Sequence, residues 1–300
     1  MTSRYGARRG RHLAPLRGRR QSRAMQAPDR TWRTDGPVRI AVDEAGAGDA
    51  VLFLHGIGGN RRNWAGQIAA LAPRARALAL DFRGYGESDD GPLPRAFADF
   101  TDDALAVLDA AGIAAAHVVG LSMGGLVAQA LYARAPGRVA SLVLAGCRPG
   151  SAPVPPGEGF ADRRLGPLED GGSTADLAEA LLPGLLGPAV APGARARIRD
   201  SLLALRPGPY RATLAARTAM APVLDPATIA VPTLVLAGGA DRVAPPEQMR
   251  ALAGTIPGAL YAEIPAAGHL MNIEKPALFD ALLADFLDGL APARAAQGTG

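Results

Sequence analysis

The sequence is poor in several residue types, and each scarcity excludes a class of protein. Its 300 residues include one cysteine, Cys147, so an internal disulfide cannot form and a reducing cytoplasm is expected. No stretch approaches the roughly 18 uninterrupted apolar residues of a membrane helix. One cysteine and four histidines, scattered along the chain, do not supply the ligand spacing of a zinc site. We therefore expect a cytoplasmic protein without a metal site or a membrane anchor.

Positive charge is concentrated at the N-terminus. Residues 1–36 hold ten arginines and two acidic residues, a net of +8, whereas the whole chain nets +4, so the remaining 264 residues net −4. A basic extension could contact nucleic acid or an anionic membrane. We favour a disordered extension, or a translation start at Met25, and expect no nucleic-acid or membrane partner. The pairs Arg8-Arg9 and Arg19-Arg20 lack the apolar segment of an export signal.

From residue 37 onward, short apolar runs alternate with helical stretches. Val51–Leu54 is a continuous apolar run, typical of a strand that is buried on both faces. The alternation predicts an α/β fold with a mostly parallel sheet and helices on both faces. Functional residues of such sheets lie at the carboxyl ends of the strands. The expected strands are 38–42, 51–54, 77–80, 117–121, 141–145, 234–236 and 260–264, and the expected helices are 97–111, 123–134 and 276–287.

The alternation stops between about residues 151 and 222. This segment begins rich in Pro, Gly and Ala and then shows helical patterns over 174–186 and 194–205. The helical spacing of its leucines, at 177, 181 and 182, favours a folded helical cap over a disordered insertion. The expected organisation is a disordered extension (1–36), a first core segment (37–150), the cap (151–222), a second core segment (223–290) and a frayed tail (291–300).

One motif predicts a nucleophile. Gly120-Leu-Ser-Met-Gly124 fits Gly-x-Ser-x-Gly, and it lies between a predicted strand and a predicted helix, which is the setting of a nucleophile elbow. On such a sharp turn the two glycines let the backbone pass closely, while Ser122 is raised above the sheet. The dipole of the following helix favours negative charge that develops there. The alternative is a glycine-rich turn with a solvated serine.

A serine hydroxyl is a weak nucleophile and requires a base. Elimination leaves His269, which follows the predicted strand 260–264. The other histidines are less suitable, since His12 is in the extension, His55 is in the turn after 51–54, and His117 is at the opposite end of the sheet.

An acid must hold the imidazole of the base in its useful tautomer. In folds that carry a nucleophile elbow on a mostly parallel sheet, the acid lies between the serine and the histidine in the chain. Asp241 follows the predicted strand 234–236, whereas the end of strand 141–145 holds no carboxylate and Glu274 is too close to His269 in sequence. Asp241 is therefore the predicted acid.

The turn His55-Gly-Ile-Gly-Gly59 consists largely of small residues that let backbone amides point inward. We expect the N–H groups of Ile57 and Met123 to stabilise the oxyanion of an acyl-transfer reaction. The turn lacks the Lys-Ser/Thr ending of a phosphate-binding loop, so no nucleotide cofactor is expected. Trp64 either packs behind this turn or lines an acyl pocket. For Asp81 and Arg83, in the loop 81–88, we expect a structural role through hydrogen bonds and a charge pair.

Together these motifs resemble the α/β-hydrolase superfamily, and the resemblance runs from about residue 37 to residue 287. Within it, Gly120-Leu-Ser-Met-Gly-Gly125 and the short helical cap are similar to 3-oxoadipate enol-lactonases and their carboxylesterase relatives. The resemblance implies a cofactor-free hydrolase of a small-molecule ester or lactone. Serine at position 122 differs from the aspartate of haloalkane dehalogenases and epoxide hydrolases. Carbon–carbon bond hydrolysis, perhydrolysis and a low-turnover ligand receptor remain as alternatives, and the sequence indicates neither the acyl group nor an oligomeric state.

A dicarboxylate substrate such as 3-oxoadipate enol-lactone would need cationic groups in the pocket. Arginine is abundant throughout the chain, so its presence in the cap does not by itself indicate such a substrate. The cap arginines are Arg163, Arg164, Arg195, Arg197, Arg199, Arg206, Arg211 and Arg217.

Overall fold

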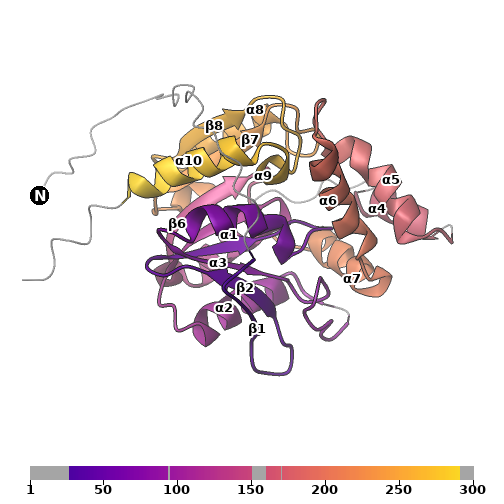
Figure 1. Cartoon of the computed structure of the whole chain (residues 1–300), viewed down its shortest axis with the longest axis horizontal. Helices are drawn as coiled ribbons and strands as arrows, with labels where there is room; N and C mark the ends of the chain where they lie inside the picture. Colours follow the sequence, from indigo (N-terminus) through magenta and orange to yellow (C-terminus); the bar gives the residue numbers. More distant parts are fainter. Residues whose placement is uncertain (1–26, 94, 151–159, 170, 291–300) are drawn as a thin grey trace, which may run out of the picture.

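A single eight-stranded sheet organises the chain (Figure 1). The computed structural model describes residues 27–290 except 94, 151–159 and 170. The strand order is β1-β2-β4-β3-β5-β6-β7-β8, with antiparallel pairing of β1 to β2 and of β2 to β4, and parallel pairing elsewhere. The predicted α/β fold with a mostly parallel sheet is confirmed. The strands are β1 Arg30–Arg33, β2 Ala41–Ala45, β3 Ala50–Leu54, β4 Arg76–Leu80, β5 Ala116–Leu121, β6 Val139–Ala145, β7 Thr233–Gly238 and β8 Leu260–Ile264.

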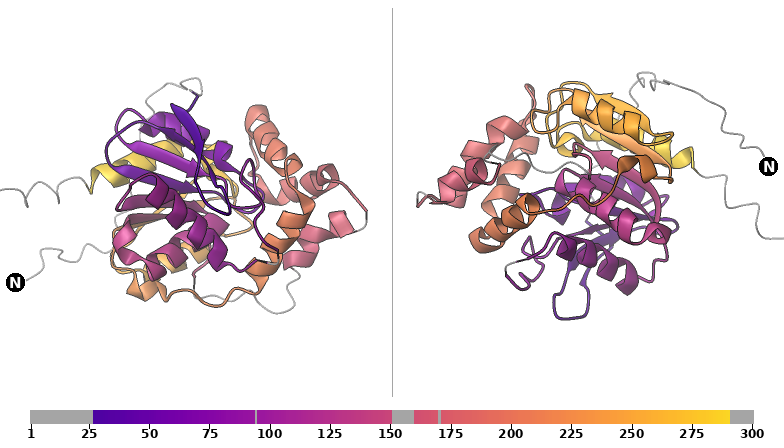
Figure 2. Two further views of the ribbon diagram at one scale, coloured as in Figure 1. Left: turned by 90° about the horizontal axis from the view of Figure 1, so that it is seen from below. Right: turned by 180° about the vertical axis from the view of Figure 1, so that it is seen from behind.

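Helices cover both faces of the sheet (Figures 1 and 2). Alternate residues of each central strand point to opposite faces, so Val51 and Phe53 join the apolar cluster under α1 and α10, while Leu52 and Leu54 join the cluster under α2, α3 and α8. This double burial explains the continuous apolar runs in the sequence. The bounds are α1 Ala65–Leu71, α2 Ala98–Ala110, α3 Met123–Arg134, α8 Pro246–Thr255, α9 Met271–Glu274 and α10 Pro276–Asp288, with short 3-10 helices η1 Arg61–Trp64, η2 Pro136–Arg138 and η3 Pro226–Thr228.

Four α-helices of the described residues lie between β6 and β7 in the chain and form the cap beside the sheet (Figure 2). They are α4 Phe160–Glu169, α5 Thr174–Leu185, α6 Pro192–Leu203 and α7 Pro207–Thr218. The predicted helices 174–186 and 194–205 correspond to α5 and α6, and Leu177 and Leu182 are fully buried. Residues 151–159, where the cap was expected to begin, lie outside the described residues.

The N-terminal boundary of the ordered fold differs from the prediction. Residues 30–33, assigned above to a disordered extension, form the edge strand β1, and the next strand covers 41–45 instead of 38–42. Polar contacts hold β1 in place, because Arg30 and Trp32 both donate to Glu44 at 2.8 Å. An exposed edge strand needs no apolar run, so its sequence resembled that of a charged tail. Residues 1–26 and 291–300 lie outside the described residues.

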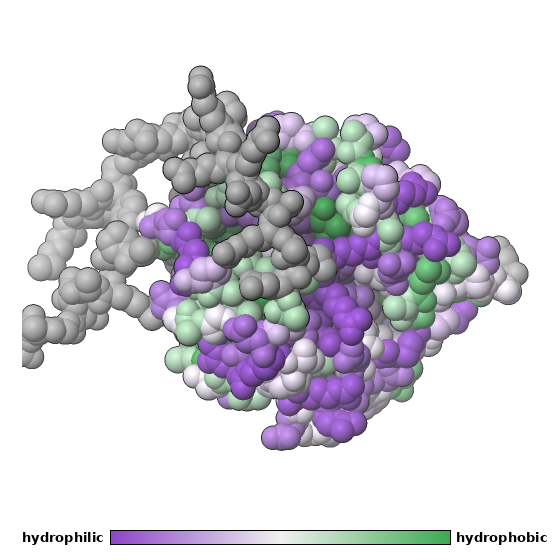
Figure 3. Space-filling model, in the orientation of Figure 1, coloured by the Kyte–Doolittle hydropathy of each residue, from purple (hydrophilic) through white to green (hydrophobic). Residues whose placement is uncertain are grey.

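Few large hydrophobic residues are exposed among the described residues. Leu93 and Leu260 are the large hydrophobic residues exposed there, and the face in Figure 3 mixes hydrophilic residues with small apolar patches. Among these residues no helix has both the length and the apolar character needed to cross a bilayer.

Candidate active site

Ser122 occupies a sharp turn between β5 and α3. Its φ of 55° and ψ of −115° lie outside the usual regions for a side-chain-bearing residue, and such strain commonly persists at functional sites. The neighbouring glycines are required by close backbone packing. A Cβ at Gly120 would lie 2.3 Å from the Gly124 carbonyl oxygen, and a Cβ at Gly124 would lie 2.1 Å from the Leu54 carbonyl oxygen. The turn thus has the geometry that the Gly-x-Ser-x-Gly motif predicts.

The two residues expected to donate to an oxyanion, Ile57 and Met123, both lie beside this serine. Met123 is the first residue of α3, so its N–H has no partner within the helix. The side chain of Ser122 makes no capping hydrogen bond to α3, which leaves its hydroxyl available. Gly56 follows β3 and passes so close that a Cβ there would lie 3.1 Å from Ser122 Cβ. Ile57, Ser122 and Met123 all line one cavity.

His269 and Asp241 are in direct contact. The Nδ1 atom of His269 lies 2.8 Å from Oδ2 of Asp241, and both residues are buried. The other oxygen of Asp241 accepts hydrogen bonds from the N–H groups of Val243 at 2.7 Å and Ala244 at 3.0 Å. These bonds fix the carboxylate toward Nδ1. His269 and Ser122 line the same small cavity beside the turn that follows β3, so the three predicted residues gather at the carboxyl ends of β5, β7 and β8.

The cap contacts the loop that carries His269. The His269 N–H donates to the Leu185 carbonyl at the end of α5, at 2.8 Å. Oε2 of Glu274 accepts from Gly268 N–H at 3.0 Å and from Gly187 N–H at 2.9 Å. The buried Glu274 carboxylate therefore joins the histidine loop to the cap. Sequence reasoning rejected Glu274 as a support for the imidazole and missed this role, which depends on a segment 87 residues away.

A second polar chain joins the loop after β3 to the segment after His269. Asn272 Nδ2 donates to the Asn63 carbonyl at 3.1 Å, and Gln67 Nε2 donates to the Asn272 carbonyl at 3.2 Å. Gln67 Nε2 also lies 2.7 Å from Oδ1 of Asp280 on α10. Burial raises the pKa of Asp280 to about 6, partly opposed by the Gln67 hydrogen bond. Folding thus retains a proton on this carboxyl above its usual titration range.

We expect Asp280→Asn to flatten part of the dependence of stability on pH. Between about pH 4 and pH 6 the folded chain binds this proton more tightly than the unfolded chain, so stability falls as pH rises through that window. Above it, the ionised carboxylate costs about 1–2 kcal/mol of unfolding free energy, which the variant recovers. Urea unfolding at several pH values measures the slope. Asp285→Asn, an exposed change on the same helix, is the control; equal slopes for wild type and Asp280→Asn would contradict the expectation.

His55 has a structural position. Its Nε2 accepts a hydrogen bond from the Phe82 N–H at 3.1 Å, and its Nδ1 lies 2.8 Å from the Gly56 carbonyl oxygen. Burial lowers the pKa of His55, although the nearby charge of Asp81 opposes this. The neutral ring, with its proton on Nδ1, satisfies both contacts and holds the turn before Ile57.

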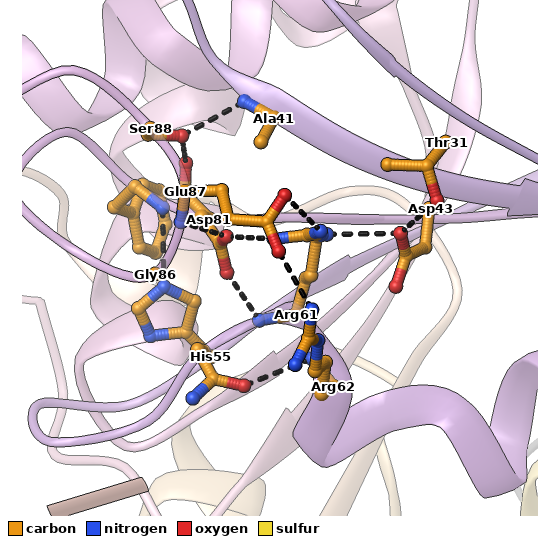
Figure 4. A network of polar contacts seen from close by, with 12 residues as sticks. Thr31, Ala41, Asp43, His55, Arg61, Arg62, Asp81, Gly86, Glu87 and Ser88 are labelled. Atoms are coloured by element: carbon orange, nitrogen blue, oxygen red, sulfur yellow. Dashed lines mark hydrogen bonds and ion pairs between the residues drawn. The ribbon is translucent and has the colours of Figure 1, made fainter. Parts of the chain in front are cut away.

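The charge pair expected within the loop 81–88 does not form; each of its two residues has another partner (Figure 4). Asp81 pairs with Arg61 rather than with Arg83, and Arg61 also bonds Asp43 at 2.9 Å. Arg83 instead bonds Asp103 of α2 at 2.7 Å. The expectation that Asp81 is structural agrees with these contacts. The partner was missed because Arg61 lies 20 residues earlier in the chain.

Trp64 lies fully buried behind the turn after β3. Its ring packs 4.9 Å from that of Phe53 and 5.9 Å from that of Phe279, measured between centroids. It borders the small cavity that also contacts Ser122 and His269, but not the larger cavity beside Ser122. This position fits packing behind the turn, and any contact with an acyl group would be confined to the small cavity.

The larger cavity has a volume of about 790 Å³ and opens beside Ser122. Its walls combine the cap helices α4, α5 and α7 with the loops after β6 and β7. Cys147 lines it, but burial raises the pKa of its thiol to about 12, so this side chain is a poor nucleophile. Within the described part of the chain, His, Cys, Asp and Glu side chains form no group of three that could hold a metal ion.

Comparison with known proteins agrees with this architecture. A model of the alpha/beta hydrolase family matches residues 51–282, and the chain belongs to that family. It is 33% identical over 257 residues to a Mycobacterium tuberculosis protein named as a non-heme bromoperoxidase, BpoC, covering 80% of this chain and 94% of that protein.

Two solved structures are also similar. One is a thermophilic esterase from Thermogutta terrifontis, with 29% identity, a TM-score of 0.80 and coverage of 87% and 99% of the two chains. The other is an enol-lactonase from Burkholderia xenovorans, with 31% identity, a TM-score of 0.75 and coverage of 84% and 97%.

Proposed function

We propose that the chain is a serine hydrolase that cleaves a carboxylic ester or lactone through an acyl-enzyme on Ser122. One observation carries this proposal. Ser122, on its strained turn, lines the same cavity as His269, and the Nδ1 atom of His269 contacts the buried Asp241 carboxylate. A serine, a base and an acid in this relation form the unit that activates a hydroxyl for acyl transfer.

The reaction proceeds in two acyl-transfer steps. The Nδ1–H group of His269 donates a hydrogen bond to Asp241 and keeps its proton. The Nε2 atom of His269 then removes the proton of the Ser122 hydroxyl as the serine oxygen attacks the acyl carbon. The N–H groups of Ile57 and Met123 donate to the oxyanion of the tetrahedral intermediate. His269 then protonates the departing alkoxide or enolate. In the second step it deprotonates water, which attacks the acyl carbon; the bond to the Ser122 oxygen then breaks, His269 returns the proton to that oxygen, and the acid is released.

Esters and lactones fit the same machinery because both react by cleavage of the acyl–oxygen bond. The similarity to an esterase and to an enol-lactonase at 29% and 31% identity supports this substrate range, with 3-oxoadipate enol-lactone as one candidate. A lactone keeps its leaving group attached to the acyl chain, so its product would have to leave the cavity as one molecule.

Perhydrolysis is a second candidate, favoured by the 33% identity to a protein named as a non-heme bromoperoxidase. In that reaction hydrogen peroxide replaces water. It gives one proton to His269 and attacks the acyl carbon, the bond to the Ser122 oxygen breaks, and His269 passes the proton to that oxygen as the peracid leaves. The first half-reaction is unchanged. Peracid formation from an ester and hydrogen peroxide, compared with release of the acid, distinguishes the two outcomes.

A fluorophosphonate probe tests the proposal directly. We expect about one equivalent of label on the folded protein, mapped by mass spectrometry to Ser122, together with steady-state release of p-nitrophenol from its acetate ester. Ser173→Ala, which removes an exposed serine at the start of α5, is the matched control and should label as wild type does. Heat-denatured protein should not label. Labelling at another residue would contradict the assignment, and a burst without turnover would indicate a ligand receptor instead of an enzyme.

A further inference from the structure

The cavity beside Ser122 is positively charged. Four arginines line it and come from four separate parts of the fold, whereas no Asp or Glu of the described residues does. The remaining walls are largely apolar. Cationic side chains that line one cavity give it a positive potential, which favours an anion there. The four are Arg148 after β6, Arg164 on α4, Arg217 on α7 and Arg242 after β7.

Arg217 is the most informative of these. It is 5% exposed, and its Nη1 is buried without a hydrogen-bond partner among the described residues. Burial, together with the charge of Arg148, lowers the pKa of Arg217 to about 10, so the guanidinium still carries its charge at neutral pH. Buried cations are normally paired and hydrogen-bonded, because an unpaired one pays a large desolvation cost. The guanidinium of Arg217 is buried at the cavity wall with an unused donor, so an anion bound in the cavity would supply the missing partner.

The abundance of arginine does not explain this arrangement. Residues 37–300 carry a net charge of −4, so the cavity differs in sign from the rest of the fold. Other cap arginines have partners within the chain. Arg199 bonds Glu179 at 2.9 Å, Arg206 bonds Asp90 at 2.7 Å, and Arg211 donates to the Leu168 carbonyl at 3.1 Å. Arg217 differs from them in being buried at the cavity wall without an acidic partner.

Building on the proposed hydrolase activity, we infer that this cavity binds a carboxylate carried by the substrate, with Arg217 as its main ligand. The substrate class is then an ester or lactone whose acyl chain ends in a second carboxylate. A guanidinium presents paired N–H donors that match the two oxygens of a carboxylate. The apolar walls suit the methylene groups between the two ends, and the positive cavity attracts the anion from solution.

A matched pair of substrates tests this inference. Mono-p-nitrophenyl glutarate and p-nitrophenyl pentanoate have five-carbon acyl chains and the same leaving group, and they differ in the terminal carboxylate. The readout is the ratio of kcat/KM for the charged ester to that for the neutral one. We expect the ratio to exceed one in wild type and to fall about 10- to 100-fold in Arg217→Met, since the variant removes charge-assisted hydrogen bonds to the carboxylate.

Arg199→Met removes the same charge from an exposed cap position and should leave the ratio unchanged. Arg242→Met provides a second variant at an exposed cavity position, where folding is not at risk, and should lower the ratio about 2- to 5-fold. A ratio that is the same in wild type, Arg217→Met and Arg242→Met would overturn the inference.

Inhibition separates this inference from the hydrolase proposal. Glutarate should compete with the neutral ester more strongly than pentanoate or sulfate does, because it offers a second carboxylate on a five-carbon chain. Efficient Ser122-dependent hydrolysis of both esters with equal inhibition by the three anions would overturn the carboxylate site and leave the hydrolase proposal intact. If neither ester is hydrolysed, the hydrolase proposal fails, and calorimetric titration of glutarate into wild type and Arg217→Met decides the site alone.

Discussion

Ser122→Ala and His269→Ala are each expected to lower kcat for p-nitrophenyl acetate by on the order of 10⁵- to 10⁶-fold, and the double variant is expected to lose no more than either single change. The reason is that the two side chains act as one unit. Without the imidazole the hydroxyl keeps its proton, and without the hydroxyl the imidazole has nothing to activate except water. The residual rate would come from the backbone amides and from binding.

The measurement is steady-state kinetics of the four proteins: wild type, the two single variants and the double variant. Far-ultraviolet circular dichroism and Tm check that each variant is folded, and Ser173→Ala controls for the loss of a serine. Substantial turnover in Ser122→Ala would identify a different nucleophile. Losses that multiply in the double variant would mean that Ser122 and His269 act independently, which contradicts the proposed mechanism.

The central sheet was predictable because its strands are buried on both faces. A strand that is buried on both faces needs consecutive apolar residues, as in Val51–Leu54, and such runs are easily recognised in a sequence. The edge strand Arg30–Arg33 was not predictable in this way, because its side chains face solvent and its stability comes from contacts with Glu44. Helices α1 and α8 were also missed, and both are short, at seven and ten residues.

In the candidate site, too, residues marked by a local sequence pattern were predictable and those that depend on distant contacts were not. Ser122, Asp241 and His269 were assigned from local patterns and from chain order, and the structure brings them to one edge of the sheet. The roles of Glu274 and Arg217 depend on contacts between segments distant in sequence, so no local pattern marks them. For Arg217 the signal was present, as one of eight cap arginines, but what distinguishes it among the described ones is its burial at the cavity wall without an acidic partner.

The buried ion pairs beneath the turn after β3 lead to the largest expected effect on stability. Arg61 is 3% exposed in its side chain, and it bonds both Asp81, which is fully buried, and Asp43. Although burial opposes the charged form, these carboxylates raise the pKa of Arg61 above its usual value. Asp81 also accepts hydrogen bonds from the backbone N–H groups of Arg61 at 2.6 Å and Glu87 at 2.8 Å. The guanidinium thus joins η1 to strand β2 and to the loop after β4.

Arg61→Met is therefore expected to cost about 3–5 kcal/mol of unfolding free energy, because it leaves two carboxylates buried without their cation. The corresponding fall in Tm is about 10 °C for a chain of this size. Arg62→Met is a closely matched control, since the neighbouring side chain is 70% exposed and contacts the exposed side of the network at Glu87. Its cost should stay within about 0.5 kcal/mol. Urea unfolding of both variants measures the difference.

A third variant separates loss of the cation from loss of packing. Asp81→Asn in the Arg61→Met background removes one of the stranded charges and keeps a side-chain oxygen that can accept one of the two backbone hydrogen bonds, which the carboxylate receives on Oδ1 and Oδ2. If the stranded charge is the cause, the double variant is more stable than the sum of the single effects predicts, by about 1–3 kcal/mol. Additive effects, or equal costs for Arg61→Met and Arg62→Met, would show that the buried pair contributes little. The turn before Ile57 would then be held mainly by the backbone contacts of His55.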